Sequence, residues 1–166
     1  MDDCTECGFS YDPDDVPAAS RTVRERAADI AGIMRTTGID LRSRPEPEVW
    51  SPLEYACHVR DLLLVHRERI LSARRIDGFV CESMGRERVE FDGWAEQEPG
   101  DVARQTADAA LMLANVLDRL DAPAWKRELV YPYPEPATRP ISWVALHVVH
   151  EAHHHLVDIR RQLASG

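Results

Sequence analysis

The sequence lacks any apolar run long enough to cross a membrane. Its longest run of leucine, isoleucine and valine covers only residues 62–65, whereas a membrane-spanning helix needs about 20 apolar residues. The first residues also lack the basic and then apolar pattern of a signal peptide. We therefore expect a cytoplasmic protein that does not act at a membrane.

Positive charge is also scarce. The chain has 20 basic and 29 acidic residues, which gives a formal net charge of -9. Proteins that bind nucleic acid or anionic lipid surfaces need an excess of positive charge to attract phosphate groups. The composition thus argues against nucleic acid and anionic membranes as partners.

Cysteine is rare, with four residues in the chain. Cys4 and Cys7 have the CxxC spacing of one zinc-ribbon knuckle, but a ribbon needs a second CxxC and the sequence has none. Two interpretations stay open: a surface dithiol, or a second zinc site that Cys4 and Cys7 share with other residues or with a partner chain. A redox CxxC is disfavoured because no βαβ pattern surrounds the motif.

The chain divides into a short tail and one domain. Residues 1–16 contain six acidic residues and no basic one, and they predict a loosely attached acidic tail that carries the CxxC motif. Residues 17–166 are long enough for one domain with its own core. Four segments of this domain have apolar residues at helical spacing, and no convincing strand pairs lie between them. The pattern predicts an all-α fold, a four-helix bundle.

The second of these segments has the clearest helix start. Ser51 can cap the helix, Pro52 suits its first turn, and Glu54 can reach back to complete a capping box. The helix is expected to continue to Gly78. The last helix is expected to begin near Pro140.

Five of the seven histidines lie in this last helix, between residues 147 and 155. At roughly 100° per residue, His155 lies about 60° and Glu151 about 100° from the centre of the apolar stripe, on the same shoulder. His58 lies on a shoulder of the second helix. Shoulders of facing helices meet at the rim of a bundle core, where bundle metal sites form. The sequence therefore predicts a divalent metal site of His58, Glu151 and His155 with an open fourth position.

Four further residues are candidates for supporting this site. Asp158 lies one turn beyond His155 and can hold the second nitrogen of a ligand or bind substrate. His66 lies near the centre of its helix's apolar face, which indicates a core or pocket-lining histidine. Trp50 and Tyr133 are candidates for the lining of an open cleft over the metal.

The last helix also contains an HExxH pattern, typical of zinc proteases. Its ligands would be His150 and His154, but both lie about 160° from the apolar stripe, on the side expected to face solvent. No histidine or glutamate follows His155 to supply a downstream ligand. A metalloprotease is therefore only a remote alternative.

The two histidine segments resemble those of the DinB-like four-helix-bundle family. Residues 50–61, WSPLEYACHVRD, are similar to the start of that family's second helix, and residues 150–159, HEAHHHLVDI, to its last helix. DGWA at 92–95 and WKR at 125–127 suit the segments between them. The resemblance spans roughly residues 18–164.

The resemblance implies a ligand set and an activity. In the family, one side chain of the second helix and two of the last helix bind a divalent metal, and these match His58, Glu151 and His155. Glutamate at position 151 is similar to the arrangement in mycothiol-dependent maleylpyruvate isomerase. That enzyme has an extra C-terminal domain with no counterpart in this sequence, so isomerase activity is not expected. The family implies a metal-dependent S-transferase that joins mycothiol or another small thiol to an electrophilic small molecule.

The metal itself is expected to be zinc or nickel ahead of iron. The alternative from another class is a non-catalytic metal-binding or stress-response module, whose site would be closed by a fourth protein ligand. The sequence does not fix the oligomeric state, and a homodimer is compatible with it.

Overall fold

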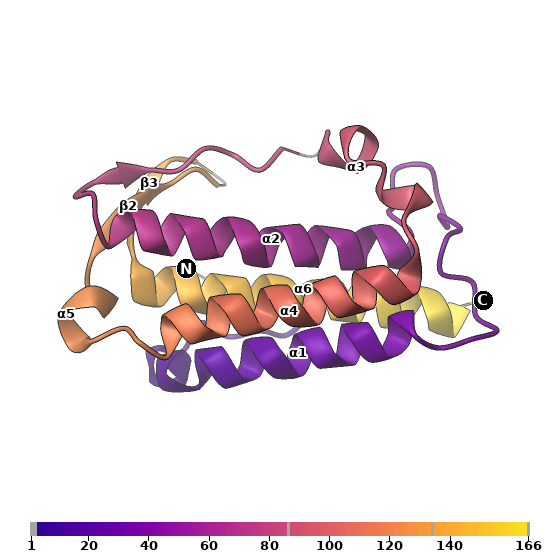
Figure 1. Ribbon diagram of the computed structural model, residues 1–166, viewed down its shortest axis with the longest axis horizontal. Coiled ribbons are helices and arrows are strands. Elements are labelled where there is room, and N and C mark those ends of the chain that lie inside the picture. Colours follow the sequence, from indigo (N-terminus) through magenta and orange to yellow (C-terminus); the bar gives the residue numbers. More distant parts are fainter. Residues whose placement is uncertain (1–2, 86, 134, 166) are drawn as a thin grey trace.

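The computed structural model describes residues 3–85, 87–133 and 135–165. Four long helices lie side by side (Figure 1): α1 (Ala19–Met34), α2 (Pro52–Ala73), α4 (Pro99–Leu117) and α6 (Ile141–Ser165). Helices α1 and α6 run in one direction, and α2 and α4 in the other. Helix α4 packs against α1 and α2, and α6 packs against the same two helices. The predicted all-α four-helix bundle is confirmed. The consecutive helices α1 and α2 lie in diagonal positions of the bundle.

Short elements join the helices. They are the 3-10 helices η1 (Pro13–Ala18) and η2 (Trp94–Glu96), the single-turn helices α3 (Arg88–Phe91) and α5 (Ala122–Trp125), and the strands β1 (Phe79–Val80), β2 (Glu128–Tyr131) and β3 (Ala137–Pro140).

The strands form a small sheet that the sequence analysis did not predict. Strand β2 pairs in parallel with β1 and antiparallel with β3, with Leu129 opposite both Phe79 and Arg139. The sheet lies toward the end of the bundle where α2 ends (Figure 1). Strands of two to four residues are too short to show an alternating pattern, so the expectation that these loops hold no paired strands was wrong.

Helix α2 begins where the sequence predicts. The Ser51 hydroxyl accepts from the Glu54 amide at 3.2 Å, and a Glu54 carboxylate oxygen accepts from the Ser51 amide at 2.8 Å. Arg44 donates to both oxygens of this carboxylate, at 2.8 and 2.6 Å. Burial alone would raise the pKa of Glu54, but the bonds from Arg44 and Ser51 outweigh it and lower that pKa. The helix ends at Ala73, earlier than expected, because the chain turns there toward β1.

The core is built from the apolar stripes of the four helices. Its largest fully buried side chains include Ile30, Leu63, Leu113, Leu156 and Ile159. Each such side chain contributes roughly 1.5–3 kcal/mol relative to an exposed one. Among the described residues, none of the helices combines the length and apolar character needed to span a bilayer.

The N-terminal segment, residues 3–12, lies against α6 rather than hanging loosely as expected. The rings of Phe9 and His150 are 5.3 Å apart, and the Tyr11 ring stacks 6.1 Å from that of Trp143. Arg161 donates to the backbone carbonyl of Glu6. The acidic composition of this segment suggested that solvent surrounds it. The rings of Phe9 and Tyr11 instead pack it against α6.

His66 lies in the core, 1% exposed. Its Nδ1–H donates to the Leu62 carbonyl at 2.8 Å, so its Nε2 accepts from the Tyr131 hydroxyl at 2.9 Å. Burial, with a smaller contribution from the charge of Arg69, lowers the pKa of His66 to about 3. The imidazole is therefore neutral throughout the physiological range.

We expect this histidine to make the fold sensitive to acid. The folded pKa lies below the ordinary value of 6.5, so its stabilising contribution is complete above pH 6.5. Between pH 6.5 and pH 3 that contribution falls by about 1.4 kcal/mol for each pH unit. The reason is that His66 binds a proton in the unfolded chain but not in the folded one. His66→Gln cannot titrate, so between pH 7 and pH 5 its free energy of unfolding should fall by about 2 kcal/mol less than that of the wild type. Urea unfolding at both pH values measures this, and equal losses in the two proteins would contradict it.

Candidate metal centre

The structure brings together the three predicted ligands. One donor atom from each of His58, Glu151 and His155 lies within 4.8 Å of the other two. His58 comes from α2, and the other two come from successive turns of α6. The rings of His58 and His155 have centroids 4.8 Å apart, and His155 Nε2 is 3.7 Å from Glu151 Oε2. The cluster lies where shoulders of α2 and α6 meet, as the helical periodicity predicts.

These residues fit a divalent metal ion. Two imidazoles and one carboxylate are a donor set that zinc and nickel accept, and they leave a fourth position open. The Nδ1–H of His155 donates to Asp158 Oδ2 at 3.1 Å, which leaves the lone pair on Nε2, the nitrogen that faces Glu151. An outer carboxylate fixes a metal-binding histidine in this way.

The charges around the cluster also favour a cation. Burial alone would raise the pKa of Glu151, but the electrostatic attraction of His155, in its protonated form, and of His147 outweighs it and holds that pKa far below the usual range. Burial opposes the charged form of His155, but the carboxylates of Asp158 and Glu151 outweigh it and raise its pKa. The two carboxylates therefore create a negative electrostatic environment that attracts a proton or a metal ion.

Aromatic side chains surround the cluster. The Trp50 ring lies 5.0 Å from that of His58, and the Tyr55 ring stacks 5.1 Å from that of His155. Trp94 is buried 5.9 Å from His58, and its indole N–H donates to Asp61 at 3.1 Å. The sequence analysis proposed Trp50 but missed Tyr55, although its position one turn before His58 places both on one side of α2. These rings supply apolar contact beside the metal position.

Two proposed pocket residues lie elsewhere. His66 is in the core two turns along α2, bonded to Tyr131 rather than to the cluster. Tyr133 is 69% exposed in the turn between β2 and β3. Among the described residues, the structure therefore joins Trp50 and Asp158 to the three ligands, and leaves His66 and Tyr133 outside.

His150 and His154 lie on the opposite side of α6 from its apolar stripe, as predicted, but they do not face solvent. Their side chains are only 13% and 20% exposed, because the N-terminal segment covers them. One donor atom from each lies within 4.8 Å of the Cys4 and Cys7 sulfurs. Two nearby sulfurs do not suit a protease centre, which needs an open position at its zinc.

Tyr11 is a further residue that the sequence analysis missed. Its hydroxyl lies 2.9 Å from Nδ1 of His147 and 2.8 Å from Nδ1 of His150. Burial raises the pKa of Tyr11, with a smaller contribution from the charge of Glu151. The hydroxyl therefore stays protonated and links two histidines of α6. No local pattern marks this contact, which joins residues far apart in the sequence.

Comparison with known proteins gives a family and a fold. Residues 19–159 match the model of the DinB superfamily. The fold is similar to that of YfiT from Bacillus subtilis, described as a probable metal-dependent hydrolase with an unusual four-helix bundle topology. The two structures superpose with a TM-score of 0.76 over 93% of this chain and 91% of that one, at 15% sequence identity. No curated protein gives a significant sequence match.

Proposed function

Because the chain belongs to the DinB superfamily, we propose that it is a metal-dependent enzyme that transfers a small thiol of the mycothiol type to an electrophilic small molecule. His58, Glu151 and His155 would hold one divalent ion, zinc or nickel. The observation that carries the proposal is the geometry of His155, whose Nδ1 is bonded to Asp158 while its Nε2 faces Glu151. Three ligands from two helices leave a position for the thiol.

His58, Glu151 and His155 would hold the divalent ion, and its positive charge would supply a lower pKa for a thiol brought to the open position. In the transfer, the S–H bond breaks and its proton passes to solvent. A carbon–sulfur bond forms, and the leaving group departs from carbon with its electron pair.

The surrounding residues have separate tasks in this proposal. Asp158 keeps the proton on Nδ1 of His155 and so keeps Nε2 available as a ligand. Trp50 and Tyr55 flank the two histidine rings and offer apolar surface for the electrophile. Their bulk also limits the access of water to the thiolate.

The test is a conjugation assay with mycothiol and monochlorobimane, in which sulfur displaces chloride and fluorescence reports the product. We expect zinc- or nickel-loaded protein to accelerate the reaction over buffer, and chelator-treated protein to lose the acceleration until metal is restored. Arg160→Gln is a control on the same helix, because Arg160 forms an exposed ion pair with Asp29, and it should keep the activity. A loaded protein that accelerates conjugation of no small thiol would contradict the transferase.

Metal-dependent hydrolysis is the second candidate, favoured by the similarity to YfiT, which is described as a probable metal-dependent hydrolase. The same three-ligand site can activate water instead of a thiol. Thiol-independent hydrolysis of a p-nitrophenyl ester, lost with the metal, would identify this activity. Tight metal binding with neither activity would instead indicate the non-catalytic module.

A further inference from the structure

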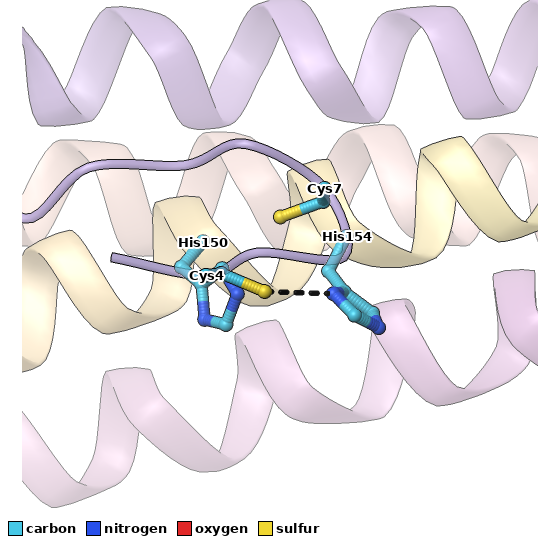
Figure 2. Close-up of side chains that lie close together, drawn as sticks. All are labelled: Cys4, Cys7, His150 and His154. Atoms are coloured by element: carbon cyan, nitrogen blue, oxygen red, sulfur yellow. Dashed lines mark hydrogen bonds between the residues drawn. The ribbon is translucent and has the colours of Figure 1, made fainter. Parts of the chain in front are cut away.

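A second group of potential ligands lies on the other side of α6 from the core. Figure 2 shows Cys4 and Cys7 of the N-terminal segment close to His150 and His154 of α6, with Cys4 between the two histidines. The Cys4 sulfur is 3.6 Å from Nδ1 of His154. One donor atom from each of the four residues lies within 4.8 Å of the other three.

A tight backbone loop presents the two sulfurs. The Cys4 amide donates to the Phe9 carbonyl at 2.9 Å, and the Gly8 amide donates to the Cys4 carbonyl at 2.8 Å. Gly8 has a φ of 74°, a left-handed conformation that favours glycine. His153 donates from Nε2 to the Cys7 carbonyl at 3.2 Å. The loop is thus fixed to α6 at the point where the sulfurs meet the histidines.

His150 has one ring nitrogen bonded and one without a partner. Its Nδ1 is bonded to the Tyr11 hydroxyl, whereas its buried Nε2 has no hydrogen-bond partner among the described residues. The Tyr11 hydroxyl has one proton, so it donates to one of its two histidines and accepts from the other. When it donates to His147 and accepts from His150, the Nε2 lone pair of His150 is available for a metal.

His154 has a similar arrangement. Its Nδ1 points to the Cys4 sulfur, and its Nε2 lies 3.6 Å from carboxylate oxygens of both Glu6 and Asp158. A carboxylate behind the far nitrogen is a common support for a histidine that ligates zinc. Each imidazole therefore has one nitrogen beside an oxygen atom, while the other nitrogen of His154 points to the Cys4 sulfur and that of His150 has no hydrogen-bond partner among the described residues.

We propose that Cys4, Cys7, His150 and His154 bind a zinc ion as a closed Cys2His2 site. Four protein ligands of this kind fill a tetrahedral zinc and leave no position for substrate, so the site is structural. It would fix residues 3–12 over α6. Glu151 and His155 of the open site directly follow His150 and His154 in the chain, so this zinc would also hold the helix that presents those ligands.

Metal counting tests the proposal. Wild-type protein purified under reducing conditions and loaded with zinc should retain two ions per chain after desalting, and Cys4→Ser with Cys7→Ser should retain one. Cys81→Ser is the matched control, since Cys81 lies outside the group, and it should retain two. His58→Ala should lose the ion of the open site but keep the ion of the Cys2His2 site. Failure of the proposed activity can therefore be distinguished from failure of the Cys2His2 site.

Cobalt adds a spectroscopic test that reports sulfur ligation directly. Cobalt-loaded wild type and His58→Ala should both show near-ultraviolet sulfur-to-cobalt charge-transfer bands, which the double serine variant should lack. If that variant fails to fold by circular dichroism, His154→Gln, which keeps both thiols, should lose one zinc ion instead. Reduced wild type without charge-transfer bands, or a serine variant with two zinc ions, would overturn the proposal. A disulfide between Cys4 and Cys7 that persists in zinc-loaded protein would do the same.

Discussion

Replacing His155 with alanine is expected to remove the metal ion of the open site and to lower the rate of thiol conjugation by more than about 100-fold. His155 is the proposed ligand with a carboxylate beside each ring nitrogen, Asp158 at Nδ1 and Glu151 near Nε2. Changes to residues that only support a ligand typically cost 10–100-fold in metal affinity or activity, so loss of the ligand itself should cost more. Plasma emission analysis should show one metal ion fewer per chain than the wild type.

Asp158→Asn provides the graded comparison for this experiment. The amide keeps the size of the side chain but loses the negative charge, so we expect metal affinity to fall by about 10–100-fold without complete loss. Arg160→Gln, which changes an exposed ion pair with Asp29 on the same helix, should retain the wild-type metal content of the open site. His155→Ala protein with full occupancy and full activity would refute the assignment of this ligand.

Replacing Glu54 with alanine is expected to destabilise the fold by about 2 kcal/mol, chiefly through the lost cap of α2, because the Arg44 side chain is partly exposed. The carboxylate is only 2% exposed, binds Arg44 through both oxygens, and completes the capping box with Ser51. Its removal leaves the Arg44 charge without its partner and an amide at the start of α2 without its acceptor. Urea unfolding with unchanged m-value measures the loss.

The same substitution should also weaken the open metal site, because Glu54 lies one turn before His58 and the cap holds the end of the loop that carries Trp50. The matched control is Glu25→Ala in α1, whose pair with Arg21 is long, at 3.8 Å, and exposed. That control should change stability by less than about 0.5 kcal/mol. Similar losses in the two variants would contradict the role given to the buried pair.

Local patterns in the sequence predicted the bundle and the proximity of His58, Glu151 and His155. The capping box at Ser51 and Glu54 is a local signal, and so is the angular position of Glu151 and His155 on one helix. Pairing these two with His58 needed only the rule that shoulders of adjacent helices meet at the core rim. These features were predictable because helical periodicity fixes side-chain direction without knowledge of the rest of the fold.

The contacts that the sequence did not reveal join distant segments. The sheet pairs strands near residues 79, 129 and 139, each too short to have a pattern. The N-terminal segment contacts α6 through Tyr11 and Cys4, more than 130 residues away from their partners His147 and His154. The helical periodicity correctly predicted that His150 and His154 lie on the side of α6 away from the core. It could not show that another segment covers that face.

The most direct test of the open site is a crystal structure of the zinc-loaded protein with data collected on both sides of the zinc absorption edge. We predict an anomalous peak bound by His58, Glu151 and His155, with zinc–nitrogen distances of about 2.0–2.1 Å and a fourth position without a protein ligand. No peak between these three side chains, or a peak there with a fourth protein ligand, would contradict the open metal site.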